Sequence, residues 1–149
     1  MRTVVQRIRG GQVRVNGKVV ADAGFGLLAL VGFCRGDTPK VVDWLAQKLI
    51  TLRVFEDSSS KINLSLKDVH GDLVVVSQFT LCATLKKGTR PSFDDALPFT
   101  EAQKLYEALL ERLRSIYPPE KIFSGVFGAT MEVDFVNYGP VTVIVEKVL

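Results

Sequence analysis

Apolar and polar residues alternate at the start of the chain, in residues 3–9 and again in residues 12–15. This period of two is typical of strands with one buried face. Asn16-Gly17 follows the second run and precedes another apolar pair, Val19-Val20. Both central residues of a type I′ turn need positive φ, so Asn-Gly between two such runs is a strong hairpin signal. The chain is therefore predicted to open with a β-hairpin.

Two later segments have the spacing of helices. Thr38-Pro39 supplies a capping residue and a proline at the first helical position, and a second helix is expected to start at Thr100, where residues 100–103 match a capping box. This second helix should end before Pro118-Pro119. The apolar stripes behind these predictions are Val41, Val42, Leu45, Leu49, Ile50 and Leu52 in the first helix, and Ala102, Leu105, Tyr106, Leu109, Leu110, Leu113 and Ile116 in the second.

The remaining apolar runs have the length of strands. Residues 27–33 form a nearly continuous run, which favours a strand covered on both faces. Further strands are expected at 73–81, around 124–136 and at 141–145, with residues 137–140 as a hairpin loop between the last two. The pattern indicates an α/β fold in which two main helices pack on a mixed, largely antiparallel sheet, and we expect one domain over residues 1–149.

Composition excludes several classes of protein. Of the 149 residues 47% are hydrophobic and 23% are charged, as in ordinary globular proteins and unlike collagen or disordered tails. The longest apolar stretch is too short for a membrane helix, and the first residues have no apolar segment of a secretory signal, so a cytoplasmic protein is expected. Cys34 and Cys82 match no zinc spacing and are predicted to be buried free thiols. No metal or cofactor is expected.

The chain is poor in catalytic side chains. Its single histidine, His70, lies in a turn, where solvent exposure is the more common situation. No GxSxG, HExxH, Walker or GxGxxG motif is present. The acidic pairs, Glu56-Asp57, Asp94-Asp95 and Glu132 with Asp134, are interpreted as solvated surface.

Polar residues occur abruptly at the end of the apolar run that starts at Leu73, where Ser77, Gln78 and Thr80 follow four apolar positions. An unsatisfied buried polar group costs about 1–3 kcal/mol, so these side chains must find partners or contact a ligand. The residues alone leave both interpretations open. If the strand continued, Gln78 and Thr80 would share one face.

Two other segments contain candidate functional groups. Lys86, Lys87 and Arg90 lie close together in a loop that ends near Phe93, and such a loop either is simply solvated or neutralises phosphates while the aromatic ring stacks on a base. Gly139-Pro140 is expected to be trans on base rates, since only about 5–6% of X-Pro bonds in folded proteins are cis.

These segments together resemble the D-aminoacyl-tRNA deacylases of the bacterial and eukaryotic type. The two signature motifs of that family are present as Ser77-Gln78-Phe79-Thr80-Leu81 and as Asn137-Tyr138-Gly139-Pro140-Val141-Thr142. A related animal group departs from the first motif at its serine and phenylalanine, and both are present here. The similarity covers essentially the whole chain, with further matches at residues 1–7, 52–57, 90–93 and 125–129.

The resemblance implies a barrel-like deacylase fold and an intertwined homodimer with two active sites at the subunit interface. The partner would be tRNA, not DNA or a membrane, and the substrate a D-amino acid or glycine esterified to its terminal adenosine. In this family the Gly-Pro bond is cis and reaches into the partner's pocket. By this analogy, the carbonyls of Gly139 and Pro140 meet the α-amino group and leave no room for an L side chain.

The resemblance also suggests roles for single residues. The amides of Phe79 and Thr80 would lie near the ester carbonyl, Ser77 and Gln78 would orient the terminal nucleotide, and its 2′-hydroxyl would help to activate water. A competing hypothesis makes Thr80 a nucleophile, although no base is expected beside it. Contacts to acceptor-stem phosphates are assigned to Lys86, Lys87 and Arg90. A different class of function, a non-catalytic module that binds a tRNA end, is the alternative.

Overall fold

The N-terminal hairpin organises the sheet. In the computed structural model, which describes residues 1–148, β1 (Arg2–Val15) and β2 (Lys18–Ala23) pair antiparallel. Asn16 and Gly17 connect them with φ of 51° and 78°, which confirms the predicted turn. The two runs that alternate in the sequence are a single strand, because β1 passes through Gly10 and Gly11 without interruption.

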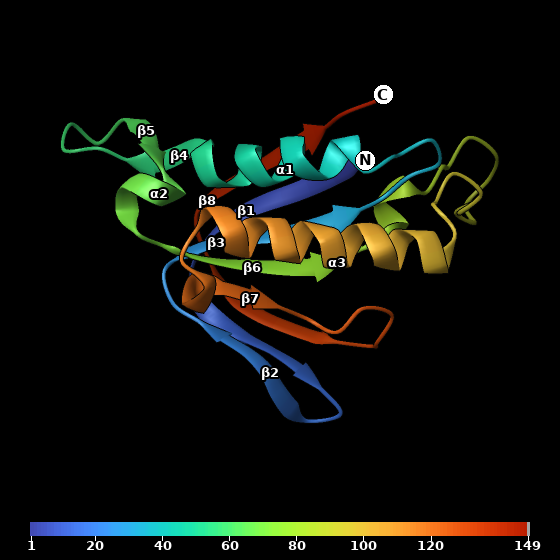
Figure 1. The fold of residues 1–149 in the computed structure, drawn as a ribbon, viewed down its shortest axis with the longest axis horizontal. Helices are drawn as coiled ribbons and strands as arrows, with labels where there is room; N and C mark the ends of the chain where they lie inside the picture. The colour runs from blue at the N-terminus through green and yellow to red at the C-terminus, as the bar shows by residue number, and fades with distance from the viewer. Residues whose placement is uncertain (149) are drawn as a thin grey trace.

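Six strands form one mixed sheet with the order β2-β1-β3-β6-β7, and β8 (Glu132–Glu146) pairs with β1. β3 (Gly26–Gly32), β6 (Asp72–Ser77) and β7 (Ile122–Ser124) are parallel to one another, while the pairs that involve β1 are antiparallel. β3 is almost entirely buried, as its apolar run predicted. The sheet curls into a nearly closed barrel (Figure 1). The predicted mixed α/β class is confirmed.

Two long helices, α1 (Lys40–Thr51) and α3 (Phe99–Ile116), cover one face of this sheet (Figure 1). Their predicted apolar stripes are buried in the main core. A short helix, α2 (Leu66–Val69), and a separate two-stranded sheet of β4 (Arg53–Glu56) and β5 (Ile62–Ser65) lie beyond α1. No helix within residues 1–148 is long and apolar enough to cross a membrane.

The predicted side-chain caps of both long helices are wrong. The helices begin after Pro39 and Pro98, and neither start has a side-chain cap. At the first helix, the Val41 N–H donates to the main-chain carbonyl of Thr38 instead of to its side chain. Thr100 lies inside the first turn of α3, two positions after the capping residue Pro98.

Two strand predictions are corrected. β6 ends at Ser77, and the chain enters a 3₁₀ turn, η1 (Phe79–Cys82), instead of continuing to residue 81. The expected hairpin loop at 137–140 does not exist, because β8 runs unbroken from residue 132 to residue 146 along the long strand β1. Within it the Gly139-Pro140 bond is cis, contrary to the base rate.

The two cysteines form a disulfide, so the prediction of free thiols is wrong. Cys34 follows β3 and Cys82 ends η1, which follows β6. Because β3 and β6 are parallel neighbours, both cysteines are carried to the same end of the sheet, and their Cα atoms are 5.6 Å apart. A distance of this size lies within the range that a disulfide spans. The bond ties the end of η1 to the segment between β3 and α1.

Candidate active site

The first signature motif lies at the carboxyl ends of two parallel strands, the usual place for a site in such sheets. Ser77 is the last residue of β6 and pairs with Val31 of β3. The Gln78 N–H donates to the Val31 carbonyl over 2.7 Å, and this is the last hydrogen bond before the chain turns away. Gln78 then leaves the strand conformation, with φ −146° and ψ 78°, and η1 begins.

The start of η1 presents two main-chain donors. Inside the turn the Leu81 N–H donates to the Gln78 carbonyl over 3.2 Å, and the Ala83 N–H donates to the Thr80 carbonyl over 3.1 Å. The first N–H groups of any helix lack an acceptor within the helix. Within residues 1–148, those of Phe79 and Thr80 have no other acceptor. Two adjacent N–H groups of this kind can stabilise an oxygen that gains negative charge.

The side chains around this turn supply no general base. The Gln78 amide Nε2 donates to Thr80 Oγ1 over 2.5 Å. An amide donor cannot accept the proton that an attacking hydroxyl must lose. Among residues 1–148, no histidine or carboxylate forms a hydrogen bond with Thr80. The geometry therefore favours chemistry carried by main-chain groups.

β6 is held in place from behind by a tyrosine. The Tyr106 hydroxyl of α3 donates to the Val75 carbonyl over 2.8 Å, two residues before Ser77. Burial raises the pKa of Tyr106 to about 12, so its hydroxyl stays protonated as a donor. The strand end that carries the first motif is thus fixed by α3 as well as by β3.

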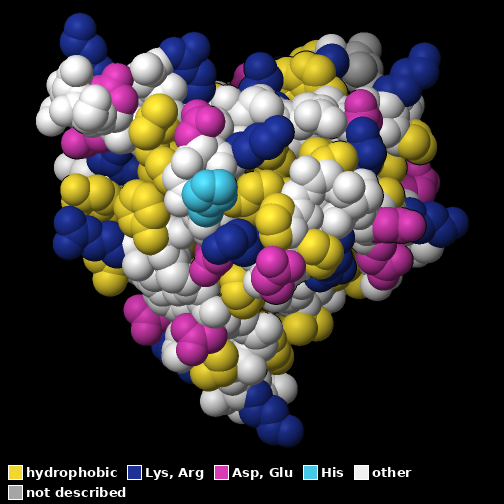
Figure 2. Space-filling view, turned by 60° about the vertical axis from the view of Figure 1, so that its left-hand side comes forward, with side chains coloured by type: hydrophobic (Ala, Val, Ile, Leu, Met, Phe, Trp, Pro, Cys, Tyr) yellow, Lys and Arg dark blue, Asp and Glu magenta, His cyan; other side chains and the backbone are white. Residues whose placement is uncertain are grey.

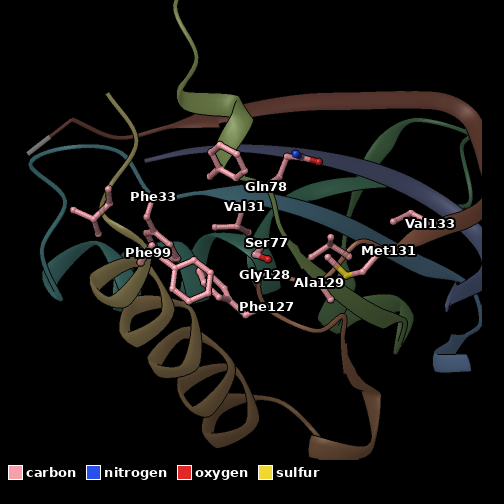
Figure 3. Close-up of a pocket in the computed structure, with 14 residues that line it drawn as sticks. Val31, Phe33, Ser77, Gln78, Phe99, Phe127, Gly128, Ala129, Met131 and Val133 are labelled. Carbon is pink, nitrogen blue, oxygen red and sulfur yellow. The ribbon is translucent and has the colours of Figure 1, made fainter. Parts of the chain in front are cut away.

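A cavity of about 600 Å³ opens beside Ser77, Gln78 and Phe79 (Figure 3). Phe99 and Phe127 close one end, with ring centroids 5.0 Å apart and an angle of 69° between the planes, and Met131 and Val133 lie towards the other end. Such an apolar lining with polar groups at one side suits a flat, partly polar ligand. The remaining lining residues are Val31, Phe33, Val76, Leu97, Ala102, Gly128 and Ala129.

A smaller cavity of about 200 Å³ lies next to the first. Gln78 and Val133 line both cavities, so the two meet there. The smaller one also contains the side chains of Gln6 and Asn137. The first motif therefore borders two hollows, one mainly apolar and one with several amides.

Asn137 is the only residue of the second motif that lines either cavity beside Gln78 within residues 1–148, and Gly139-Pro140 does not reach the site. Gly139 and Pro140 are exposed and are absent from the lining of either cavity beside Gln78. Gly139 has φ of 125°, which L side chains rarely adopt. A Cβ placed on it would come within 2.9 Å of Arg7 Nη2 and 3.0 Å of the Val141 nitrogen, so only glycine fits without displacement.

Arg7 supports the second motif, and the sequence interpretation missed it. Its side chain is only 4% exposed, and it donates from Nε to the Tyr138 carbonyl and from Nη1 to the Val54 carbonyl, both over 3.1 Å. Nη2 lies 3.7 Å from the Glu56 carboxylate, and the guanidinium also faces the Tyr138 ring. Strand periodicity contained a signal, because Arg7 shares a face of β1 with Thr3 and Val5, both buried.

The basic loop is closed at its base and open at its tip. Thr84 and Ser92 exchange two main-chain hydrogen bonds of 2.9 Å. Lys86, Lys87 and Arg90 are exposed, and none of them forms an ion pair within the part of the chain that the structure describes. The three cations are therefore available for an anionic ligand.

His70 takes no part in this arrangement. It ends α2 with φ of 50° and lies on the surface, where its ring is visible in Figure 2. It lines neither cavity beside Gln78. The exposed turn histidine of the sequence interpretation is confirmed.

Comparison with known proteins agrees with these motifs. A family model described as D-Tyr-tRNA(Tyr) deacylase matches residues 4–146. D-aminoacyl-tRNA deacylases of Carboxydothermus hydrogenoformans and Clostridium acetobutylicum are 49% and 44% identical; the alignments cover 98% and 99% of this chain, and 99% and 97% of those proteins.

Two solved structures have the same fold. One is titled c-Myc DNA unwinding element binding protein, with a TM-score of 0.95, 40% identity and full coverage of both chains. The other is titled as a probable eukaryotic D-amino acid tRNA deacylase, with a TM-score of 0.83 over 97% of both chains; at 20% identity it supports the fold alone.

Fold, motifs and relatives together define a hydrolase that acts on the ester of an aminoacylated tRNA. The chain belongs to the D-Tyr-tRNA(Tyr) deacylase family, and D-aminoacyl-tRNA is its class of substrate.

Proposed function

We propose that the protein removes D-amino acids, and also mischarged glycine, from tRNA and leaves L-aminoacyl-tRNA intact. One observation carries this proposal: the turn that holds the free N–H groups of Phe79 and Thr80 borders a cavity, whereas Gly139 and Pro140 are exposed and line neither cavity beside Gln78. A second copy would bring the exposed Gly139-Pro140 segment to the cavity. The complete site would then be made almost wholly of main-chain groups from two chains.

The sheet edge supports such a homodimer. β8 is a 15-residue strand that pairs with β1 along one side only, within residues 1–148. It exposes Val136 and Ile144 to 59% and 63%. A long edge strand with exposed apolar side chains is a liability unless another chain covers it. A partner that covers β8 lies next to the exposed second motif, because Gly139 and Pro140 are part of that strand.

The proposed reaction is hydrolysis by water. Water attacks the ester carbonyl, the bond to the ribose 3′-oxygen breaks, and that oxygen leaves with a proton. The N–H groups of Phe79 and Thr80 stabilise the negative oxygen of the intermediate, which is the largest contribution we assign to the protein. Ser77 and Gln78 hold the terminal nucleotide, and its 2′-hydroxyl assists the water.

Chirality is read by exclusion. The carbonyls of Gly139 and Pro140 from the partner accept hydrogen bonds from the substrate α-ammonium group and place the α-carbon against the main chain. A D side chain then points out of the site, an L side chain collides with it, and glycine passes because it has no side chain. Selection of this type works by rejecting the wrong substrate.

Lys86, Lys87 and Arg90 contact the phosphates of the acceptor stem in this proposal, as contacts that position the tRNA without reading its sequence. The protein would act in the cytoplasm on tRNA, with no need for DNA or a membrane. Reversing the three charges is expected to weaken tRNA binding and to reduce its salt dependence.

The decisive experiment compares release of amino acid from D-tyrosyl-tRNA and L-tyrosyl-tRNA by the purified protein. We expect fast loss of the D ester alone. Equal loss of both esters would contradict chiral exclusion, and binding of tRNA without loss of either would favour a module that only holds the tRNA end.

A second comparison separates the two mechanisms. With a 2′-deoxy terminal adenosine, turnover of the D ester should be abolished, whereas Thr80→Ala should retain most of its activity. A covalent acyl group trapped on Thr80 would instead establish this residue as the nucleophile.

A further inference from the structure

Two phenylalanines form an exposed pair at the mouth of the large cavity. Phe79 and Phe93 are 55% and 41% exposed, and their ring centroids are 5.2 Å apart with an angle of 65° between the planes. Phe79 lines the cavity, whereas Phe93 does not, so Phe93 is the outer member of the pair. Exposed aromatic rings at the edge of a binding site are typical of surfaces that meet a ligand.

The outer ring is held on a fixed backbone despite its exposure. Next to it, Ser92 pairs with Thr84. On its other side the Asp94 carbonyl accepts from Arg35 Nε and Nη2 over 3.1 and 2.8 Å. The Ala96 N–H also donates to the Phe93 carbonyl over 3.0 Å. A ring whose main chain is fixed in this way loses little conformational freedom when a ligand stacks on it.

The charges beside the pair indicate what that ligand is. The loop that ends at Phe93 carries Lys86, Lys87 and Arg90, and none of these cations is neutralised by an ion pair within residues 1–148. A flat apolar surface next to unpaired cations suits single-stranded nucleic acid, whose bases stack on aromatic rings while cations contact the phosphates. A partner protein with an apolar patch would not require the cations.

From this arrangement we infer that Phe93, supported by Phe79, stacks on the base of the nucleotide that precedes the terminal adenosine of the tRNA. The inference rests on the proposed function, because it takes the terminal adenosine to occupy the cavity. The preceding nucleotide then lies just outside the cavity, where Phe93 is, and its phosphates lie towards the basic loop. The role is positioning, since Phe93 touches neither the ester nor the attacking water.

Two substrates that differ only beyond the terminal nucleoside test this inference. One is D-tyrosyl-tRNA, and the other is adenosine esterified with D-tyrosine, which has no preceding base. Stacking on an aromatic ring contributes about 1–3 kcal/mol per base, so Phe93→Ala should lower kcat/KM for the tRNA substrate roughly tenfold, mainly through KM. The same variant should leave kcat/KM for the adenosine ester unchanged.

Two matched variants separate stacking from simple apolar contact. Phe93→Leu keeps an apolar side chain without a ring face and should behave like Phe93→Ala, whereas Phe93→Trp should retain wild-type activity on tRNA. Equal losses on both substrates would show that Phe93 only supports Phe79, and no loss on tRNA would show that no base stacks there. Either result overturns the inference.

A binding measurement keeps the inference testable if the proposed function fails. Trp44 is the single tryptophan of the chain, so in the double variant Trp44→Phe/Phe93→Trp the fluorescence comes from the indole at position 93 alone. Its fluorescence should change with the dinucleotide cytidylyl-adenosine and not with adenosine alone. Loss of neither ester by the wild-type protein would refute the proposed function, whereas the absence of a fluorescence change with the dinucleotide would refute the stacking.

Discussion

The turn at Phe79–Cys82 and the segment Tyr138–Pro140 both present main-chain groups, but the protein holds them in opposite ways. The turn is fixed by the last hydrogen bond between β6 and β3 and by the Cys34–Cys82 disulfide. The segment lies where the pairing of β8 with β1 shifts register, between Gln6 and Ile8, so regular strand pairing does not hold it.

Arg7 replaces the missing strand pairing at that point, since its guanidinium hydrogen-bonds to one carbonyl on each side. The turn thus depends on a disulfide and on strand hydrogen bonds, whereas the segment Tyr138–Pro140 depends on one buried cation. Substitution of the side chains that hold these main-chain groups in place should therefore disturb both segments. Four changes test this comparison, from the largest expected effect to the smallest.

Arg7→Ala should have the largest effect. It leaves the buried Val54 carbonyl and the half-buried Tyr138 carbonyl without their charged donor, and each such loss costs about 1–3 kcal/mol. We expect the free energy of unfolding to fall by about 3 kcal/mol in denaturant titration, together with loss of activity. Arg9→Ala is the control, because Arg9 is exposed and lies 4.0 Å from the Tyr138 ring centroid. An equal loss in both variants would mean that the hydrogen bonds of Arg7 do not matter.

Removal of the disulfide should destabilise the turn at Phe79–Cys82. The double variant Cys34→Ala/Cys82→Ala is expected to lose about 2–4 kcal/mol of stability, because the unfolded chain is no longer constrained. A thiol reductant should bring the wild-type protein to a similar value and should not affect the variant. If the reductant left the wild-type unfolding curve unchanged, the bond would not support the turn.

Gly139→Ala tests the close approach at the second motif. Strain at positive φ costs about 1–3 kcal/mol, and here the added Cβ also meets Arg7 and Val141. We expect a loss of about 2 kcal/mol and a large fall in hydrolysis of D-tyrosyl-tRNA. Gly17→Ala is the matched control, because Gly17 also has positive φ and its added Cβ would meet nothing within 4 Å. The crowding argument fails if thermal unfolding shows the same loss in both.

Tyr106→Phe should have the smallest effect. Loss of the hydrogen bond to Val75 costs about 1 kcal/mol at neutral pH. Burial raises the pKa of Tyr106 to about 12, and an unfolded tyrosine loses its proton near pH 10. In the wild type, this group's contribution is complete below pH 10 and is lost as the pH rises towards 12. Unfolding followed at pH 8 to 12 should show a shallower alkaline decline in the variant, and an unchanged slope would contradict this account.

Features set by neighbouring residues were predictable from the sequence. The Asn16-Gly17 turn depends on the φ preferences of two residues, and the apolar stripes of α1 and α3 depend on helical spacing alone. The capping predictions failed because the prolines at 39 and 98 occupy the capping positions. The unbroken strand β8 was missed because its partner, β1, lies more than a hundred residues away in the chain.

The candidate site also has features that the sequence predicts and features that depend on the fold. Both motifs could be recognised, and the abrupt polar end of β6 marked the first one. Where they lie relative to each other could not be read from the chain, since that depends on the pairing of strands that are distant in the sequence. The disulfide and the clamp formed by Arg7 were missed for the same reason, because each joins segments that only the fold brings together.

Within residues 1–148, no histidine or carboxylate forms a hydrogen bond with Thr80 in the turn at Phe79–Cys82, and this has a consequence for inhibitors. Reagents that alkylate histidine or react with free thiols have no target at this turn, because His70 lies elsewhere on the surface and Cys82 is joined to Cys34 in a disulfide. Peptide N–H groups also do not titrate near neutral pH. Under the proposed mechanism, we expect inhibitors of this site to act by imitating the shape of the esterified nucleoside, and the pH dependence of turnover to follow the α-amino group of the substrate.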